Sequence, residues 1–470
     1  MENKTILLKD ADFVVRYSSR VDAFASVVIQ GNLIIEVGDS EDLKEKYQYD
    51  EVYDCKGKVV LPGLINSHTH CNETMMRGLG HQLKFHDWVD NVILPIGAAM
   101  ENMDENLYTC LAQMTAMEAV ASGTTSIIEH SVNFGKRHVY TIATALQDFG
   151  IRGAVAKGAE DFSPLDRGHV GSIEEEIRET QGFLERWKVQ GNGLIKAWVG
   201  PSGIEGKTTG GCTGDLLKEL KKLADSYDTR YHTHLAGNIW EVENIRREKG
   251  MAGSVAFADS LGILDEKTSL AHCIWVSHGE DEILRRAKPQ ICHCPSCNQI
   301  NGLGIIPLVE LRKQGTVCAI GTDGAPQNDS LDMFREMRQA VLLQKIRALD
   351  PDIMGHLDAF QMATESGAKV LGIENLGKIE PGYLADIIII QRKGNLFLTP
   401  MYDPIDTLVY AGSGGRDVAM TMVNGRVLYK DGQFRTVDAE KVISTLKEAS
   451  SLMPVPGDRF SCIYSPGAVL

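Results

Sequence analysis

Residues 59–70, VVLPGLINSHTH, join an apolar run to two histidines that are separated by a single residue. Side chains at positions i and i+2 of an extended chain point to the same side, so His68 and His70 can share one cation. A lone His-x-His pair is a weak signal, because a buried histidine is usually a satisfied core residue. Its meaning depends on what stands at the ends of the other predicted strands.

Seven more short apolar segments follow this one, and stretches with helical periodicity separate most of them. The eight predicted strands cover residues 59–67, 125–129, 152–157, 194–199, 230–234, 269–274, 290–294 and 316–322. This alternation predicts an α/β fold, a parallel (β/α)₈ barrel of the TIM type. A doubly wound open sheet is the competing fold, but the glycine-rich phosphate loop expected after one of its early strands is not visible. One predicted helix begins after Ser172, which can form a capping box with Glu175.

Both ends of the chain are rich in short β segments. They cover residues 6–8, 13–17, 25–30 and 33–37 near the start, and 385–391, 418–423 and 426–430 near the end. Gly31-Asn32 and Asn424-Gly425 supply the turn chemistry of two hairpins. We therefore expect a small β-sandwich domain formed from residues 1–58 and 375–436, a barrel over 59–374, and a C-terminal helix and tail over 437–470.

The bulk composition is that of a globular protein, with 470 residues, 43% of them hydrophobic, and a formal net charge of −15. This acidic balance argues against nucleic acid or an anionic membrane as a partner. No run approaches the ~20 apolar residues that cross a bilayer, and the N-terminus lacks the pattern of a signal peptide. We expect a cytoplasmic protein that acts on a small molecule.

The ten cysteines are expected to be reduced and mostly buried. Cys292, Cys294 and Cys297 are spaced like part of a zinc knuckle. However, no second cysteine pair follows them, so we expect core thiols.

Further candidate metal ligands stand at the ends of later strands. His232 and His234 end the fifth strand, His272 lies in the sixth and Asp323 closes the eighth. A barrel places its active site at these strand ends, so the four should meet the first histidine pair there. Imidazoles with one carboxylate suit Zn²⁺, Fe²⁺ or Co²⁺ better than Ca²⁺ or Mg²⁺, which prefer oxygen ligands. The joint pattern predicts a metal site.

The segment LPGLINSHTH, residues 61–70, resembles the first-strand motif of the amidohydrolase superfamily. The chain is similar above all to the branch with cytosine and guanine deaminases, S-adenosylhomocysteine deaminase and triazine chlorohydrolases, and to phenylurea and molinate hydrolases. The similarity runs almost end to end. It includes HTHLA at 232–236, AHC at 271–273, HCPSCN at 293–298, GTDG at 321–324 and GYLAD at 382–386.

This resemblance implies one divalent metal ion held by His68, His70, His234 and Asp323, with zinc first and iron or cobalt as alternatives. It also implies that His272 polarises the substrate and that Asp323 handles the protons of the attacking water. A bound divalent ion lowers the pKa of water towards ~7, so hydroxide becomes available near neutrality. A homo-oligomer is the expected assembly.

One position departs from the family pattern. In the deaminases of this branch, a glutamate that shuttles protons follows the fifth-strand histidine by three residues, and here that position is Gly237. Either another acid replaces it, drawn from Glu241, Glu243, Glu129 and His130, or the substrate needs no ring protonation. We expect Glu241 to be a solvated charge on the following helix.

The missing glutamate favours an enzyme that uses metal-bound hydroxide to hydrolyse a C–N bond of a small, largely apolar amide, urea or carbamate. The alternative is an aminohydrolase or a chlorohydrolase that acts on a purine, pterin, pyrimidine or s-triazine ring. A non-catalytic barrel would be expected to lose its ligands, and a lyase or isomerase to have more polar loops. Hydrolysis is therefore the first expectation.

Five residues are expected to contact the substrate: Met76, Trp88, Lys157, Trp240 and Asn328. The methionine and the tryptophans would form an apolar wall for a flat neutral substrate, although such residues often fill cores. Lys157 ends the third segment, where a carboxylated lysine could bridge two metals. We expect it to face the substrate instead, and predict a single metal. The glycine-rich residues 203–214 predict a mobile lid or a long turn.

Overall fold

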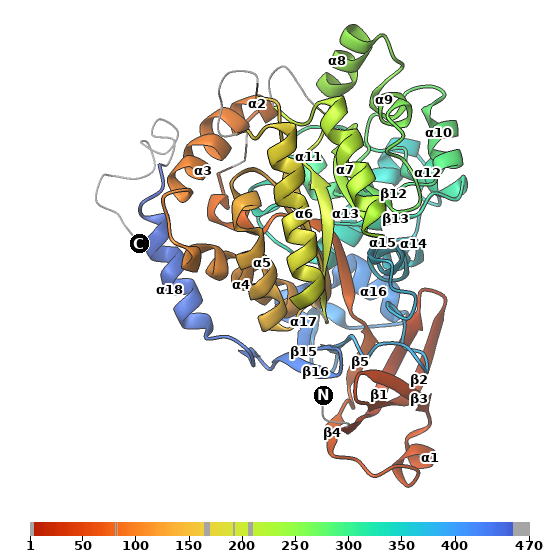
Figure 1. Ribbon diagram of the computed structural model, residues 1–470. Coiled ribbons are helices and arrows are strands. Elements are labelled where there is room, and N and C mark those ends of the chain that lie inside the picture. The colour runs from red at the N-terminus through yellow and green to blue at the C-terminus, as the bar shows by residue number, and fades with distance from the viewer. Residues whose placement is uncertain are drawn as a thin grey trace, which may run out of the picture.

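The computed structural model contains an eight-stranded parallel barrel and a mixed sheet built from both ends of the chain (Figure 1). It describes residues 4–79, 81, 83–163, 170–190, 193–204 and 210–454. Each barrel strand pairs with the next along the chain, which confirms the predicted (β/α)₈ barrel. The strands are β6 (Leu64–Thr69), β7 (Thr124–Ser131), β8 (Arg152–Ala159), β9 (Ile195–Pro201), β10 (Tyr231–Leu235), β11 (Thr268–His272), β12 (Gln290–His293) and β13 (Cys318–Ile320).

Helices follow most of the barrel strands (Figure 1). The longer ones are α4 (Glu105–Ala121), α5 (Val139–Phe149), α6 (Ile173–Gln190), α7 (Gly214–Ser226), α8 (Ile239–Lys249), α10 (Glu280–Ala287), α13 (Met333–Ala348), α16 (Pro404–Ala411) and α18 (Ala439–Ser450). The shorter ones are α1 (Ser40–Lys44), α2 (Phe85–Trp88), α3 (Leu94–Met100), α9 (Ser254–Ser260), α11 (Pro295–Ile300), α12 (Leu308–Lys313), α14 (His356–Gln361), α15 (Gly367–Leu371) and α17 (Gly414–Asp417).

Local sequence explains where these helices begin and which face they bury. The backbone N–H of Ser172 donates to the Glu175 carboxylate at 2.9 Å, and the N–H of Glu175 donates to the Ser172 hydroxyl at 3.3 Å, so the predicted capping box forms. Helix α7 is capped by Thr213, whose hydroxyl accepts from the N–H of Leu216 at 3.3 Å. Its leucines recur at helical spacing and are buried, so they fasten α7 to the barrel.

The first and last barrel strands meet through polar contacts at their catalytic ends. The N–H of Asp323 donates to the carbonyl of His68 at 3.0 Å. The side chain of Asn66 accepts from the N–H of Thr322 at 3.0 Å and donates to its hydroxyl at 2.7 Å. These contacts hold the segment after β13 against β6, and so fix Asp323 beside His68.

The apolar run at 59–67 is two strands rather than the single strand we expected. Lys58–Pro62 forms β5, which belongs to the mixed sheet, and β6 begins only at Leu64. Gly63 lies between them, where an added Cβ would stand 2.1 Å from the hydroxyl oxygen of Thr125. Only glycine permits this close approach, so the chain passes from one sheet to the other here.

The mixed sheet has nine strands and joins residues from both chain ends. Its central pairs are β5 with β14, antiparallel, and β5 with β1, parallel. The expected segments 6–8 and 13–17 form one strand with a register shift between Leu8 and Ala11. The strands are β1 (Thr5–Tyr17), β2 (Arg20–Gln30), β3 (Leu33–Gly38), β4 (Glu51–Asp54), β5 (Lys58–Pro62), β14 (Ile387–Gln391), β15 (Val418–Val423), β16 (Arg426–Lys430) and β17 (Gln433–Phe434).

Helix α18 packs against α4, and the tail after residue 454 lies outside the described residues, as do residues 205–209 of the glycine-rich loop. Every cysteine in the described part of the chain is buried and free, including the three at 292–297. Within that part, the helices are all too short or too polar to cross a bilayer.

Candidate active site

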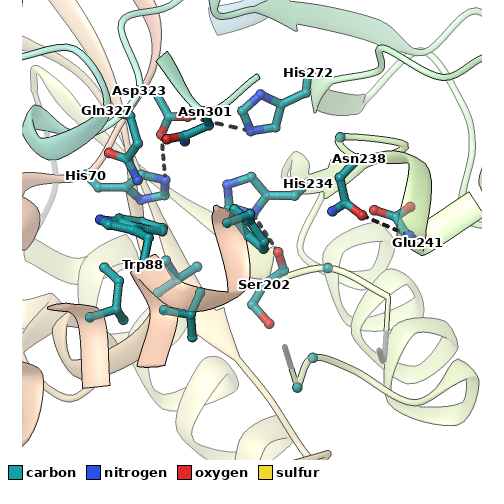
Figure 2. Close-up of a pocket in the computed structure, with 18 of the residues that line it drawn as sticks. His70, Trp88, Ser202, His234, Asn238, Glu241, His272, Asn301, Asp323 and Gln327 are labelled. Atoms are coloured by element: carbon teal, nitrogen blue, oxygen red, sulfur yellow. Dashed lines mark hydrogen bonds and ion pairs between the residues drawn. The ribbon is translucent and has the colours of Figure 1, made fainter. Parts of the chain in front are cut away.

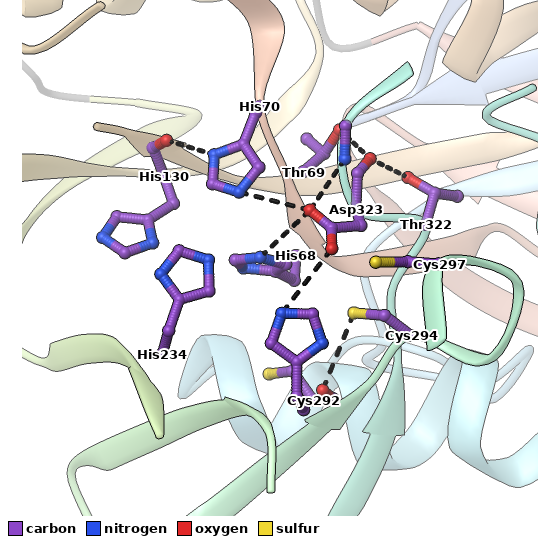
Figure 3. Close-up of polar contacts among 12 residues, drawn as sticks. His68, Thr69, His70, His130, His234, Cys292, Cys294, Cys297, Thr322 and Asp323 are labelled. Carbon is purple, nitrogen blue, oxygen red and sulfur yellow. Dashed lines mark hydrogen bonds and ion pairs between the residues drawn. The ribbon is translucent and has the colours of Figure 1, made fainter. Parts of the chain in front are cut away.

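Five histidines and one aspartate converge at the ends of the barrel strands: His68, His70, His130, His234, His272 and Asp323. Figure 3 shows most of this cluster. The ring centroids of His68 and His70 are 4.7 Å apart, and that of His234 lies 4.9 Å from His68. One oxygen of Asp323 lies 3.2 Å from Nε2 of His70 and 3.6 Å from Nε2 of His68, and the other lies 3.6 Å from Nε2 of His272. The residues that the sequence predicted as a metal site therefore share one small space.

Hydrogen bonds on the outer side of the rings fix which nitrogen faces this space. Nδ1 of His70 donates to the carbonyl of His130 at 2.7 Å, and Nδ1 of His234 donates to the carbonyl of Ser202 at 2.5 Å. Because a carbonyl only accepts, Nδ1 of each ring carries a proton, and Nε2 is the nitrogen that faces the centre and can bind a cation once it is unprotonated. Such backing hydrogen bonds are usual for histidines that bind metals.

His68 is held by a chain of buried polar groups. Its Nδ1 lies 2.8 Å from Nε2 of His232, whose Nδ1 lies 2.6 Å from the hydroxyl of Ser269. Nε2 of His68 is buried and has no hydrogen-bond partner among the described residues. A cation at the centre would satisfy this orphaned nitrogen.

The charges of the site also suit a divalent cation. Burial alone would raise the pKa of Asp323, but contacts with His68 and His70 hold it well below its ordinary value, so the carboxylate is ionised. Burial lowers the pKa of His234 to about 3, so its ring is neutral. Burial also opposes a charge on His70, yet Glu73 and Asp323 raise its pKa to about 10. The same carboxylates would favour a metal ion in place of this proton.

His130 lies closer to the centre than the sequence indicated. Its ring stacks on that of His234 with centroids 4.8 Å apart, and it joins His68, His70 and His234 in a group whose candidate ligand atoms lie within 4.8 Å of one another. Nε2 of His130 donates to the carbonyl of Gly200 at 3.0 Å, while Nδ1 has no partner in the described part. Its place at the end of a buried strand was the signal available in the sequence.

A pocket opens beside this cluster (Figure 2). Trp88, His70 and Asp323 line it together with apolar side chains, several of them from the helical segments between residues 85 and 94. The apolar lining consists of Phe85, Val89, Ile93, Leu94, Val132, Phe162, Ile204 and Leu303. Such a lining suits a flat, largely apolar ligand with its reactive end at the histidines.

Of the five residues expected to contact the substrate, Trp88 is the one in the pocket lining. Met76 is buried in the main core. Trp240 is 42% exposed and packs on the ring of His86. Asn328 donates to the carbonyl of Thr322 and to the carboxylate of Glu336, away from the pocket.

Lys157 also lies outside the pocket lining. On β8, Ala154 and Ala156 point into the barrel, so Lys157 points outward to α6 by the two-residue period of a strand. Its ammonium lies 3.2 Å from the carboxylates of Glu176 and Glu179. We missed this orientation because sequence position alone does not give the parity of a fully buried strand.

The carboxylates around the pocket differ in what they bind. Glu241 is not the solvated charge we expected: it lines the pocket, and its carboxylate accepts from the N–H of Ala236 at 2.8 Å. Burial raises its pKa. Glu129 accepts from the N–H of Cys71 at 2.7 Å and from the hydroxyl of Ser131 at 3.0 Å, so both of its oxygens are engaged.

Sequence reasoning missed two acids of the pocket lining, Glu160 and Glu73, and burial raises the pKa of both. Glu73 is 3% exposed, and its pKa is raised to about 7. The signal was its place three residues after His70, in the turn that leaves the same strand. Gly237 stands on another part of the lining, where an added Cβ would lie 3.2 Å from Cδ2 of His272.

Comparison with known proteins gives the family. A model described as the amidohydrolase family matches residues 59–428. The chain is 33% identical over 451 residues to a 5'-deoxyadenosine deaminase of Methanothermobacter thermautotrophicus, covering 96% of this chain and 99% of the relative. It is 32% identical over 443 residues to a 5-methylthioadenosine/S-adenosylhomocysteine deaminase of Pyrococcus furiosus, covering 94% and 98%.

The fold has close counterparts among solved structures. An adenosine deaminase from Xanthomonas campestris with bound zinc superposes with a TM-score of 0.87 at 23% identity, over 95% of this chain and 98% of the other. The family model covers most of the chain, and the curated relatives match it over nearly their full lengths. The chain therefore belongs to the amidohydrolase family, as its motifs led us to expect.

Proposed function

We propose that the chain is a metal-dependent aminohydrolase that removes an amino group from a nitrogen heterocycle, with the purine ring of an adenosine derivative as the first candidate. The observation that carries this proposal is the near full-length similarity to deaminases of such compounds. It reverses our first expectation, an amide, urea or carbamate substrate, in favour of the alternative we had ranked second. The flat indole of Trp88 beside the histidines is compatible with a ring substrate.

In this proposal, His68, His70, His234 and Asp323 hold one divalent ion, with zinc first because the structural counterpart from Xanthomonas campestris contains it. The ion would supply an activated water near neutral pH. Asp323, ionised and 3.6 Å from His272, would accept the proton of that water and return it to the leaving nitrogen. Nδ1 of His272 lies 3.1 Å from the side-chain amide of Asn298. In the tautomer in which Nδ1 accepts from that amide, His272 would donate a hydrogen bond from Nε2 to the ring nitrogen where negative charge develops.

A second candidate, hydrolysis of an amide, urea or carbamate, is favoured by one specific observation. Gly237 provides no proton carrier three residues after His234, where the deaminases of this branch have a glutamate. The carboxylate of Glu241 does not replace it freely, because the N–H of Ala236 engages it. Substrates that need no ring protonation would not require such a carrier.

One screen separates the two candidates. The purified protein is assayed for bound metal and for ammonia or amine release on two panels of compounds. The first holds adenosine, 5'-deoxyadenosine, methylthioadenosine, S-adenosylhomocysteine and guanine, and the second holds amides, phenylureas and carbamates. We expect about one metal ion per chain and turnover in the first panel. Turnover confined to the second panel would overturn the proposal in favour of the second candidate.

The remaining expectations stay predictions. A homo-oligomer is predicted from the family resemblance, and a cytoplasmic location is likewise a prediction. The domain bounds 1–58, 59–374, 375–436 and 437–470 are likewise proposed divisions, and limited proteolysis of the purified protein would test them.

A further inference from the structure

The loss of a glutamate at position 237 raises the question of which polar group meets the substrate beside the metal ligands. Among the described acids near the site, Glu129 has both oxygens engaged and Glu241 is bound to the loop that follows β10. Glu243 is exposed on α8. Among the described residues, Glu73 differs from all three, because one of its oxygens is buried without a hydrogen-bond partner. Glu160 also lines the pocket, but neither of its oxygens is a buried atom of this kind.

The backbone on both sides builds a place for this side chain. Glu73 lies in the 3₁₀ turn Cys71–Met76, which directly follows His70. This turn packs against the 3₁₀ turn Ala325–Gln327, which follows Asp323. An added Cβ at Gly324 would stand 1.9 Å from Oε2 of Glu73. Glycine at 324 therefore leaves the volume that the carboxylate occupies, directly beside Asp323.

This oxygen is buried and unsatisfied. Glu73 is 3% exposed, and its Oε2 has no hydrogen-bond partner in the described part of the chain, although the residue lines the pocket. Burying a carboxyl oxygen without a donor costs free energy that a donor on a ligand would offset. Gln327, which also lines the pocket, lies close to Glu73: an added Cβ at Gly324 would stand 2.7 Å from its amide oxygen, and its amide lowers the pKa of Glu73 against the effect of burial.

We propose that Glu73 is a specificity-determining residue that accepts a hydrogen bond from the N–H of the substrate group that is to be hydrolysed. This inference rests on the proposed function for the identity of that group, an amino group on a ring carbon. It limits the substrates to those with an N–H on the reacting carbon. Amino heterocycles and primary ureas satisfy it, whereas chlorinated rings and fully substituted carbamates do not, because they have no hydrogen to donate.

The test compares ligands that differ by this amino group alone. The pairs are adenine with purine, 2-aminopyrimidine with pyrimidine, and N-methyl-N-phenylurea with N-methylacetanilide, in which a methyl group replaces the amino group and no N–H remains. Dissociation constants, or kcat/KM where a probe is turned over, are measured for the zinc-loaded protein and for Glu73→Gln and Glu73→Ala. Glu280→Gln is the matched control, because Glu280 is also buried but accepts from the N–H groups of Ser277 and Ala256, outside the pocket lining.

We expect the unmodified protein and the Glu280→Gln control to prefer the amino member of at least one pair by about 10-fold or more. Glu73→Ala should lose that preference, whereas Glu73→Gln, whose amide oxygen can still accept, should keep part of it. Equal affinity for both members of every pair in the unmodified protein overturns the inference without any variant. A preference that survives in full in Glu73→Ala overturns it as well, as does a loss of bound zinc with the preference unchanged.

The outcomes also separate this inference from the proposed function. A preference confined to the urea pair and removed in Glu73→Ala supports the role of Glu73 while overturning the aminoheterocycle substrate. Turnover of an aminoheterocycle at the same rate in Glu73→Ala supports the proposed function while overturning the role of Glu73.

Discussion

Two walls of one pocket use their carboxyl groups in opposite ways. On the wall formed after β6 and β13, Glu73 has a buried oxygen, close to Asp323, with no hydrogen-bond partner among the described residues. On the wall formed after β10, Glu241 (Figure 2) accepts a hydrogen bond from the backbone of the loop that leaves the strand, and Gly237 has no side chain. The hydrogen bonds of each carboxyl group therefore decide whether it can act on a ligand.

The largest loss of activity is expected from a change at Asp323, which lies between the two walls. Asp323→Asn removes the anionic oxygens that face His68, His70 and His272. We expect kcat/KM to fall by roughly 10³-fold or more, as for loss of a proton-transfer group, together with weaker metal binding. Steady-state kinetics and metal analysis of the purified variant test this. An active, fully metallated variant would contradict the proposed role.

The next effect is a pH dependence of metal binding that originates on the Glu73 wall. In the protein without metal, Glu73 and Asp323 raise the pKa of His70 to about 10, above its ordinary value of 6.5. Binding this proton stabilises the folded, metal-free protein. The contribution to the free energy of unfolding is full below pH 6.5 and is lost as the pH rises through about 10. A metal ion must displace the proton, so the zinc affinity should rise by about tenfold per pH unit across this interval.

Competition with a chelator of known affinity, measured from pH 6.5 to 9.5, would show this slope. Calorimetry in buffers of different ionisation enthalpy gives the number of protons released per ion. The Glu73→Gln variant should flatten the slope, because Glu73 is the main carboxylate that raises the pKa of His70. A zinc affinity independent of pH in the unmodified protein would show that His70 holds no such proton.

A smaller effect is expected on the other wall. Glu241→Gln replaces a buried carboxylate that accepts from the N–H of Ala236, and the amide can still accept, though more weakly. We expect the free energy of unfolding to fall by about 1–3 kcal/mol and the reaction to slow by less than tenfold. Denaturant titration and kinetics measure both. Glu280→Gln, which loses the same type of contact to Ala256, should lose stability but no activity.

Some features of the fold and the site could be predicted from the sequence, and others could not. Strand alternation and the motifs around His68, His234 and Asp323 were enough to predict the barrel, because the positions of buried strands and their ends are local properties. The orientation of Lys157 was not predictable, since every residue of β8 is buried and the usual alternation of apolar and polar residues is absent. The break at Gly63 depends on Thr125 of a neighbouring strand, and thus on tertiary structure.

The acids show the same limit more sharply. Glu241 was expected to be solvated because it begins a helix, yet its carboxylate turns back to the N–H of Ala236, a contact that helical periodicity does not reveal. The sequence around Glu73 is that of a turn and does not indicate a role in the site. The space for its carboxylate is left by Gly324, which lies 251 residues later in the chain. Such pairings require the closed barrel.

The smallest change in activity is expected at Gly237, the position without a side chain on the wall after β10. Gly237→Ala adds a Cβ 3.2 Å from Cδ2 of His272, a contact that requires the imidazole to shift by a few tenths of an ångström. The backbone conformation at Gly237 is not left-handed, so alanine should be tolerated and the unfolding free energy should change by less than about 1 kcal/mol. We expect kcat to fall by about two- to fivefold with KM little changed, since His272 serves the proposed transition state more than binding.

Gly193→Ala is the matched control, because an added Cβ there meets nothing within 4 Å. If Gly237→Ala leaves kcat unchanged, the wall after β10 is open space and His272 tolerates movement. If kcat falls while KM holds, glycine at 237 is required to keep the imidazole in place. The glycine would then serve to position His272, and the polar contact to the substrate would be left to the opposite wall, where Glu73 stands.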